Sequence, residues 1–168
     1  MPVAFERVPA YYHKYIQLVS ATSLRDALQQ HVQDFSSFLQ TIPEDKWNSR
    51  YAEGKWSIKE LVQHVTDTER IFTYRALCIA RKDNTPLPGF DEKQYAANAK
   101  AERRTKADLI AELQAVQQAT QKLFESFDEE QLQASGMANG NPVYVEGIGY
   151  IIVGHTLHHK KILQERYL

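Results

Sequence analysis

The sequence predicts an all-α protein, a four-helix bundle, and three observations support this fold class. Four long segments carry apolar residues at steps of three and four, the period of an amphipathic helix. Capping residues, prolines and glycines mark where these segments start and stop. Strand-like patterning is confined to one short extended fragment, at residues 143 to 145. Four long helices in one chain pack most economically as a bundle.

Two long helices are expected in the first half of the chain. The first covers residues 23 to 42, where apolar positions recur with helical spacing. The second opens with a capping box, in which the Ser57 side chain accepts from a backbone N–H and Glu60 reaches back to the N-cap. This helix is expected to run from Ile58 to Arg81. Two prolines and a glycine within residues 83 to 90 then prevent it from continuing.

The second half of the chain predicts one short helix and two more long ones. The short extra helix covers residues 92 to 99, between the second and third long helices. Thr105 caps the third long helix, which ends near Phe127. The segment from 134 to 142 contains two glycines, two asparagines and a proline, and it predicts a loop. The last helix is expected from about residue 144 to 167.

Residues 1 to 20 are rich in aromatic side chains and are expected to pack on the bundle as an N-terminal arm. The chain of 168 residues, taken as residues 1 to 168, is a natural size for a single domain. The glycines of the last helix, Gly147, Gly149 and Gly154, each cost up to about 1 kcal/mol against alanine. Close packing on a neighbouring helix would justify them, and part of that surface could equally serve a homodimer.

Composition excludes several classes of function. The net charge is −1 and the charged residues are interspersed, so the basic footprint of a nucleic-acid-binding protein is missing. No segment approaches the roughly 18 apolar residues of a membrane span, and the chain does not begin with a signal-peptide pattern. We therefore expect a cytoplasmic protein without a membrane or nucleic-acid partner. Cys78 is the only cysteine, so any metal must be held by His, Asp or Glu.

Three of the six histidines lie together in the last helix, at His155, His158 and His159. At about 100° of rotation per residue, His159 lies about 40° from His155, near the centre of the isoleucine stripe, and His158 lies about 60° to the other side. Two imidazoles one turn apart can hold one ion, and His64 on the second helix could add a third. Spacing alone leaves an alternative open, because a histidine beside an apolar face is usually a hydrogen-bonded structural residue.

Several segments occur in the order of a known family pattern. The first half of the pattern comprises Tyr-Ala-Glu-Gly-Lys-Trp-Ser-Ile-Lys-Glu at 51 to 60, His64, Asp-Thr-Glu-Arg-Ile-Phe at 67 to 72, and Thr-Pro-Leu-Pro-Gly-Phe-Asp-Glu at 85 to 92. The second half comprises Ala-Asn-Gly-Asn-Pro-Val at 138 to 143, Tyr-Ile-Ile-Val-Gly-His at 150 to 155, and the pair at 158 and 159. In this order, these segments resemble the DinB-like (DinB/YfiT) superfamily, and the match spans nearly the whole chain from about Val8.

The resemblance implies a four-helix bundle that holds a metal ion through three histidines, one on the second helix and an HxxxH pair on the last. Carried over by position, these are His64, His155 and His159. Three nitrogen ligands leave at least one coordination position for water or substrate, as in catalytic sites. Zinc or nickel would suit imidazole ligands.

The resemblance also implies chemistry on a small-molecule substrate. The superfamily includes S-transferases that use low-molecular-weight thiols such as bacillithiol or mycothiol, a thiol-dependent maleylpyruvate isomerase, and metal-dependent hydrolases. A metal ion activates a bound thiol or a bound water in the same open position. We expect thiol-dependent S-transferase chemistry with a thiol co-substrate, with a metal-dependent hydrolase as the alternative. A non-catalytic metal-binding or stress-related interaction protein is the second alternative.

Other polar residues near these histidines have weaker assignments. Asp67, one turn after His64, could orient a ligand imidazole or a metal-bound water, or it could be a surface carboxylate that pairs with Arg70 or Arg75. Arg75 lies about 16 Å along the helix from His64, too far to be a ligand, and we expect it to form a structural ion pair. His158 is expected to hydrogen-bond near the site or to point to a neighbouring helix. The remaining histidines, His13 and His31, have no assigned role.

Overall fold

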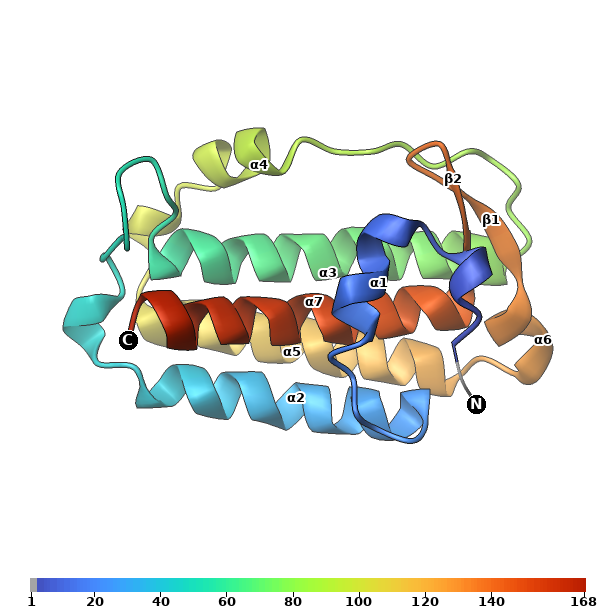
Figure 1. Ribbon diagram of the computed structural model, residues 1–168, viewed down its shortest axis with the longest axis horizontal. Coiled ribbons are helices and arrows are strands. Elements are labelled where there is room, and N and C mark those ends of the chain that lie inside the picture. Colours follow the sequence, from blue (N-terminus) through green and yellow to red (C-terminus); the bar gives the residue numbers. More distant parts are fainter. Residues whose placement is uncertain (1–2) are drawn as a thin grey trace.

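Four long helices lie side by side and form the predicted four-helix bundle (Figure 1). They are α2 (Leu24–Thr41), α3 (Ile58–Ala80), α5 (Lys106–Glu125) and α7 (Val145–Arg166). The computed structural model describes residues 3–168, so Met1 and Pro2 of the expected N-terminal arm lie outside the described residues. α2 and α3 each pack against both α5 and α7, which places α2 diagonally opposite α3.

The connection between α3 and α5 returns along the length of the bundle before α5 begins (Figure 1). It carries α4 (Glu92–Asn98) and a 3-10 turn at Ala101–Arg103, so the short helix expected at residues 92 to 99 is confirmed. Because of this return, α3 and α5 run in the same direction. α4 packs against α3, which places the connection over the helix that carries His64.

The helices start where their capping residues predict. The capping box at the start of α3 is present, since Ser57 Oγ accepts from Glu60 N at 3.3 Å and Ser57 N donates to Glu60 Oε2 at 2.7 Å. Ser23 and Thr105 cap α2 and α5 in the same way, each accepting from a backbone N–H in the first turn. A 3-10 turn at Glu44–Lys46 follows α2.

The segment at residues 134 to 142 forms most of a β-hairpin, so the prediction of a loop there is wrong. After α6 (Glu129–Gln133), β1 (Ser135–Ala138) pairs with β2 (Asn141–Tyr144) as antiparallel strands. Asn139 and Gly140 form the turn with φ values of 51° and 72°, the left-handed conformation that a two-residue Asn-Gly turn requires. Strands of only four residues are too short to show a clear alternation in sequence.

The N-terminal segment is folded against the bundle. It contains a 3-10 turn at Phe5–Arg7 and the helix α1 (Ala10–Ile16), which packs on α7. This contact depends on Gly154, because a Cβ atom there would lie 2.3 Å from the carbonyl oxygen of Tyr15. The imidazole Nε2 of His13 lies 3.0 Å from the Phe5 carbonyl oxygen and joins the two parts of the segment.

The core has two hydrophobic clusters with polar residues between them. One cluster gathers around Leu28, Phe72 and Ile148, and the other around Phe35, Leu61 and Leu163. On each long helix the residues between the two clusters include buried polar side chains. These are His31 on α2, Glu69 on α3, Gln117 on α5 and Thr156 on α7. The bundle is therefore polar at mid-length, where the histidines of α3 and α7 also lie.

A buried contact between a histidine and a carboxylate joins the diagonal helices α2 and α3 in this polar layer. His31 Nε2 lies 2.9 Å from Glu69 Oε2, and Gln117 Nε2 lies 3.2 Å from the same histidine nitrogen. His31 therefore has a structural partner. Among residues 3–168, no helix combines the length and the apolar character that a membrane crossing requires.

Candidate metal centre

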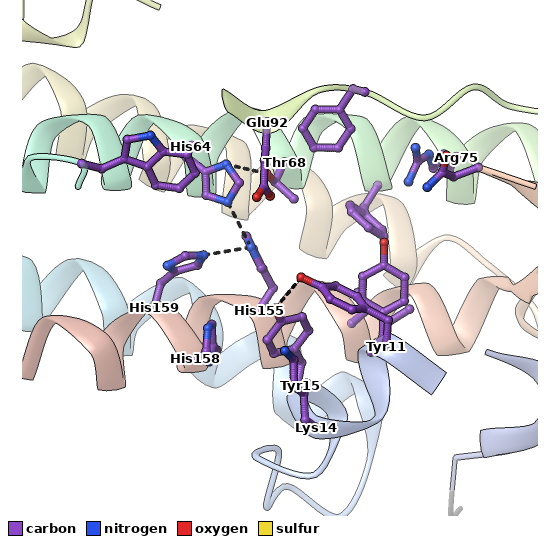
Figure 2. Close-up of a pocket in the computed structure, with 16 residues that line it drawn as sticks. Tyr11, Lys14, Tyr15, His64, Thr68, Arg75, Glu92, His155, His158 and His159 are labelled. Atoms are coloured by element: carbon purple, nitrogen blue, oxygen red, sulfur yellow. Dashed lines mark hydrogen bonds between the residues drawn. The ribbon is translucent and has the colours of Figure 1, made fainter. Parts of the chain in front are cut away.

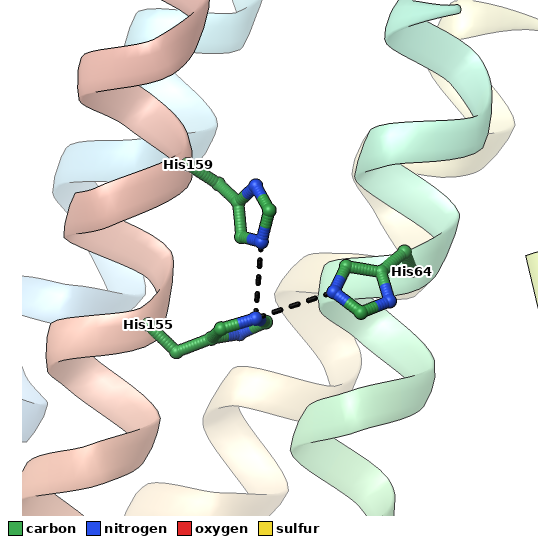
Figure 3. Close-up of side chains that lie close together, drawn as sticks. All are labelled: His64, His155 and His159. Carbon is green, nitrogen blue, oxygen red and sulfur yellow. Dashed lines mark hydrogen bonds between the residues drawn. The ribbon is translucent and has the colours of Figure 1, made fainter. Parts of the chain in front are cut away.

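Three histidine rings from two helices meet in the polar layer of the bundle (Figure 3). His64 comes from α3, and His155 and His159 come from successive turns of α7. His155 Nε2 lies 3.2 Å from His64 Nε2 and 3.0 Å from His159 Nε2. One nitrogen atom from each ring lies within 4.8 Å of the other two. The structure thus brings together the three histidines singled out from the sequence.

The arrangement of these nitrogen atoms fits a metal ion. A tetrahedral ion with bonds of about 2.0 to 2.1 Å to imidazole places its ligand nitrogens about 3.3 Å apart. The two Nε2 separations at His155, 3.2 and 3.0 Å, are close to that value. In the described part of the chain, the group consists of these three residues and contains no carboxylate. An all-imidazole set of this kind suits zinc or nickel.

Burial keeps the three imidazoles neutral, which is the form that binds a metal ion. Removal from water lowers the pKa of His64 from its ordinary 6.5 to about 4. The same effect holds the pKa of His155 and of His159 well below 6.5, and the neighbouring histidines lower both further. At neutral pH each ring therefore has an unprotonated nitrogen available.

Neighbouring side chains hold the three rings in place. The Trp56 ring lies 4.6 Å from the His64 ring, and the Tyr15 ring lies 5.8 Å from the His155 ring. Thr68, one turn after His64 on α3, has its Oγ1 3.4 Å from His64 Nδ1. This contact engages the nitrogen of His64 that faces away from the cluster, as expected for a residue that orients a ligand imidazole.

The histidines line a cavity of about 520 Å³ that lies between the bundle, the N-terminal segment and the α3–α5 connection (Figure 2). Its charged side chains are Lys14 from α1, Arg75 from α3 and Glu92 from α4. Glu92 is the one carboxylate among the described residues that line it. The hydroxyls of Tyr11 and Tyr15 lie 3.1 Å apart in its wall. The cavity therefore offers acidic, basic and hydrogen-bonding groups beside the histidines.

The structure does not bring Asp67 to the histidines. Its Oδ1 accepts from Gln63 Nε2 at 2.9 Å and lies 3.7 Å from Arg70 Nη1. It lines a different cavity, against α4. One residue step rotates the side chain by about 100°, so Thr68 rather than Asp67 reaches the His64 ring. Asp67 thus matches the alternative expectation of a carboxylate that pairs with Arg70.

Two further expectations concern residues on the cavity wall. His158 lies outside the group of three, and its ring packs 4.7 Å from the Tyr15 ring. The prediction that Arg75 forms a structural ion pair is wrong, because no carboxylate of the described residues lies within 4.0 Å of its guanidinium. Arg75 Nη2 donates instead to the Pro88 carbonyl oxygen at 2.7 Å. Cys78 is buried.

Sequence reasoning missed Glu92 and the side chains of the N-terminal segment that line this cavity. Glu92 stands at the end of the run at 85 to 92 quoted for the family resemblance, but no spacing linked it to a histidine. Tyr11, Lys14 and Tyr15 belong to a segment with no motif. Their place in the wall depends on how α1 packs on α7, which local sequence does not reveal.

Comparison with known proteins supports the fold and the family. The family model of the DinB superfamily matches residues 27–163. The structure resembles YfiT from Bacillus subtilis with a TM-score of 0.75 and 16% identity, covering 98% of this chain and 90% of that chain. YfiT is described as "a probable metal-dependent hydrolase with an unusual four-helix bundle topology". The structure of this chain also resembles that of the DinB-like protein YjoA from Bacillus subtilis, with a TM-score of 0.59 and 23% identity. The match covers 84% of this chain and 86% of YjoA.

One curated relative matches over a shorter stretch. This protein of Oceanobacillus iheyensis is named "Putative metal-dependent hydrolase OB0413" and is 32% identical over 57 residues. The match covers 33% of this chain and 32% of that protein, so it spans about a third of the relative's own length.

Proposed function

This chain belongs to the DinB superfamily, and from that premise we propose that it is a metal-dependent hydrolase that acts on a small molecule. A divalent ion, zinc or nickel, is held by His64, His155 and His159. The observation that carries the proposal is the convergence of these three nitrogen atoms on the wall of a cavity of about 520 Å³. A structural site would be closed by a fourth protein ligand, whereas a catalytic site keeps a position open.

The ion would act as a Lewis acid and would lower the pKa of a bound water. The chain's own residues have separate tasks. Glu92 accepts a proton from the attacking water, since it is the carboxylate on the cavity wall. Thr68 Oγ1 accepts from Nδ1–H of His64, so that Nε2 of that ring stays free for the ion.

The hydroxyls of Tyr11 and Tyr15, 3.1 Å apart in the cavity wall, are suited to hold the substrate. Burial raises the pKa of the Tyr15 hydroxyl, and the adjacent Tyr11 hydroxyl raises it further. Tyr15 therefore keeps its proton at neutral pH and can donate to a carbonyl oxygen. The Tyr15 ring centre lies 5.8 Å from that of His155, and both residues line the cavity, which supports this role for the hydroxyl.

Hydrolysis stands ahead of thiol transfer in this proposal because YfiT and the Oceanobacillus iheyensis protein both carry hydrolase descriptions. The S-transferase chemistry expected from the sequence uses the same three histidines and remains a prediction. It would require a low-molecular-weight thiol in the cavity. A non-catalytic metal protein would have little use for a cavity that has the histidines and Glu92 in its wall.

The experiment that tests this function combines metal analysis with turnover. Wild type, His155→Ala and the surface variant Gln118→Ala are purified, their metal content is measured by mass spectrometry, and ester and amide substrates are screened with and without added thiol. Wild type and Gln118→Ala should bind one equivalent of metal and hydrolyse substrate, and His155→Ala should do neither. Full metal content in His155→Ala would reject the site. Turnover only with thiol would assign transferase chemistry instead.

A further inference from the structure

Arg75 is a buried cation without a counterion. Its side chain lies on α3, three turns beyond His64, and the residue is only 4% exposed. No carboxylate in the described part of the chain lies within 4.0 Å of its guanidinium. Buried charges in proteins are normally paired, because removal from water costs several kcal/mol per ion. The missing partner therefore requires an explanation.

Arg104, in contrast to Arg75, has carboxylate partners. Arg104 pairs with Asp108 and Glu112, and these hydrogen bonds raise its pKa. Burial lowers the pKa of Arg75, and the Tyr12 hydroxyl is the ionisable group that acts on it in the opposite direction. The Arg75 guanidinium also lies 4.9 Å from the centre of the Phe72 ring. Neither an aromatic face nor a neutral hydroxyl neutralises the charge.

A purely structural role does not account for Arg75. Its hydrogen bond to the Pro88 carbonyl oxygen uses one of the five N–H donors of a guanidinium. The Pro88 segment has other anchors, since Leu87 N donates to Met137 O at 3.0 Å and Asn139 N donates to Leu87 O at 2.9 Å. The hairpin thus holds this segment directly. The Tyr12 hydroxyl also accepts from the guanidinium, which leaves further donors of Arg75 available, and Arg75 lines the cavity that contains the histidines.

Arg75 and the histidines stand at opposite ends of this cavity (Figure 2). Eleven helical positions separate Arg75 from His64, about 16 Å along the axis of α3. The wall also contains apolar groups of Tyr12, Phe72 and Ile151. A ligand that fills the cavity would therefore have a polar end at the histidines, an apolar body, and a second end at Arg75.

We propose that Arg75 binds an anionic group, a carboxylate or a phosphate, at the end of the substrate remote from the bond that reacts. This inference rests on the proposed function only in placing the reacting bond at the histidines. The guanidinium fork matches both anions through paired hydrogen bonds, and bringing the anion to Arg75 supplies the missing counterion. The substrate class is thus a small ester or amide with an apolar body and an anionic end.

The test uses ligands that cannot react. Linear α,ω-dicarboxylates from succinate to sebacate, and the monocarboxylate of each length, are titrated calorimetrically into metal-loaded wild type, Arg75→Gln and Arg75→Lys. In wild type, one dicarboxylate of suitable length should bind at least tenfold more tightly than its monocarboxylate. Arg75→Gln should abolish this advantage, and Arg75→Lys should keep part of it because it retains the charge. An ω-phosphonocarboxylate that shows a larger Arg75-dependent advantage would identify phosphate as the anion.

Two results would overturn the proposal: no advantage of any dicarboxylate in wild type, or the same advantage in Arg75→Gln. Metal content verifies that Arg75→Gln is folded, because the three histidines meet only in the folded chain. If Arg75→Gln does not fold, Arg75→Lys provides the test. A reduced dicarboxylate advantage in Arg75→Lys would support the proposal, whereas an arginine with only a structural role would leave that advantage unchanged. If wild type binds no metal, the proposed function fails, whereas Arg75-dependent binding of a monocarboxylate by the metal-free protein would still support this site.

Discussion

His64 Nε2 and His155 Nε2 lie 3.2 Å apart although 91 positions separate the two residues in the chain. Helices α3 and α7 pack directly against each other, and this packing places the two rings together. A third imidazole, that of His159, lies at the same point. The packing of the two helices therefore brings several nitrogen lone pairs together, as a metal ion requires.

Replacing His159 should remove the metal, whereas replacing its neighbour His158 should not. His159 Nε2 lies 3.0 Å from His155 Nε2, but the His158 ring packs on Tyr15. We expect His159→Ala to weaken metal affinity by more than about a hundredfold, beyond the loss typical of a residue that only orients a ligand. His158→Ala is the matched control and should retain wild-type affinity in a competition titration with a chelator. Equal losses in the two variants would contradict the assignment.

Thr68→Val should weaken metal binding about tenfold without unfolding the protein. The substitution removes the oxygen atom 3.4 Å from His64 Nδ1 and leaves that ring free to rotate. Thr66→Val is the control, because Thr66 is equally buried on α3 but bonds the Val62 carbonyl oxygen within its own helix. The same chelator titration applies. If Thr66→Val lost as much affinity as Thr68→Val, a general disturbance of α3 would explain both.

Glu92→Gln should lower kcat by about a hundredfold or more and leave the metal content unchanged. The amide fills the same space in the cavity wall but cannot accept a proton from water. Glu129→Gln, on the exposed start of α6, should behave as wild type. Steady-state kinetics on the substrate found in the screen measures the effect. Unchanged kcat in Glu92→Gln would show that another group accepts the proton.

Gly154→Ala should destabilise the protein by about 1 to 3 kcal/mol, the usual range for overpacking. Its Cβ would lie 2.3 Å from the Tyr15 carbonyl oxygen, and backbone cannot move aside easily. At Gly149 the new Cβ would meet the ends of the Leu24 and Phe124 side chains at 2.7 and 2.9 Å. Leu24 can adjust, so Gly149→Ala should cost less, also because alanine favours the helix. Urea unfolding measures the free energy of unfolding of the two variants. Equal losses of stability would argue against the close contact between Gly154 and the Tyr15 carbonyl oxygen.

Acid should destabilise the metal-free protein as the pH falls from 6.5 toward 4. Burial lowers the pKa of His64 from 6.5 to about 4 and holds the pKa of His155 and His159 well below 6.5. The unfolded chain therefore binds protons at a higher pH than the folded chain does, so protons favour unfolding. Stability is complete above pH 6.5, and roughly 3 kcal/mol is lost by pH 4 from His64 alone.

Urea unfolding of the metal-free protein across this pH range measures that loss. His64→Gln removes one of the titrating groups and should lose less stability than wild type between pH 6.5 and 4. The same pH dependence in both proteins would mean that folding does not lower the pKa of His64.

Some features of this protein follow from short stretches of sequence. The apolar period and the caps at Ser57 and Thr105 predicted the long helices, because these signals act between residues one turn apart. The HxxxH spacing placed His155 and His159 on one face of one helix for the same reason. The family resemblance then supplied His64. The hairpin around Asn139 was missed, since a pair of four-residue strands leaves almost no pattern.

Only the tertiary structure decided which side chains surround these histidines. Thr68 rather than Asp67 lies against His64, Glu92 joins the cavity from a connection that returns over α3, and Arg75 is buried without a carboxylate. These outcomes depend on the rotation of α3 and on its neighbours α4, α1 and α7. A local sequence pattern predicts which residues share a helix face. Which side chains pack against that face depends on contacts between segments far apart in the chain.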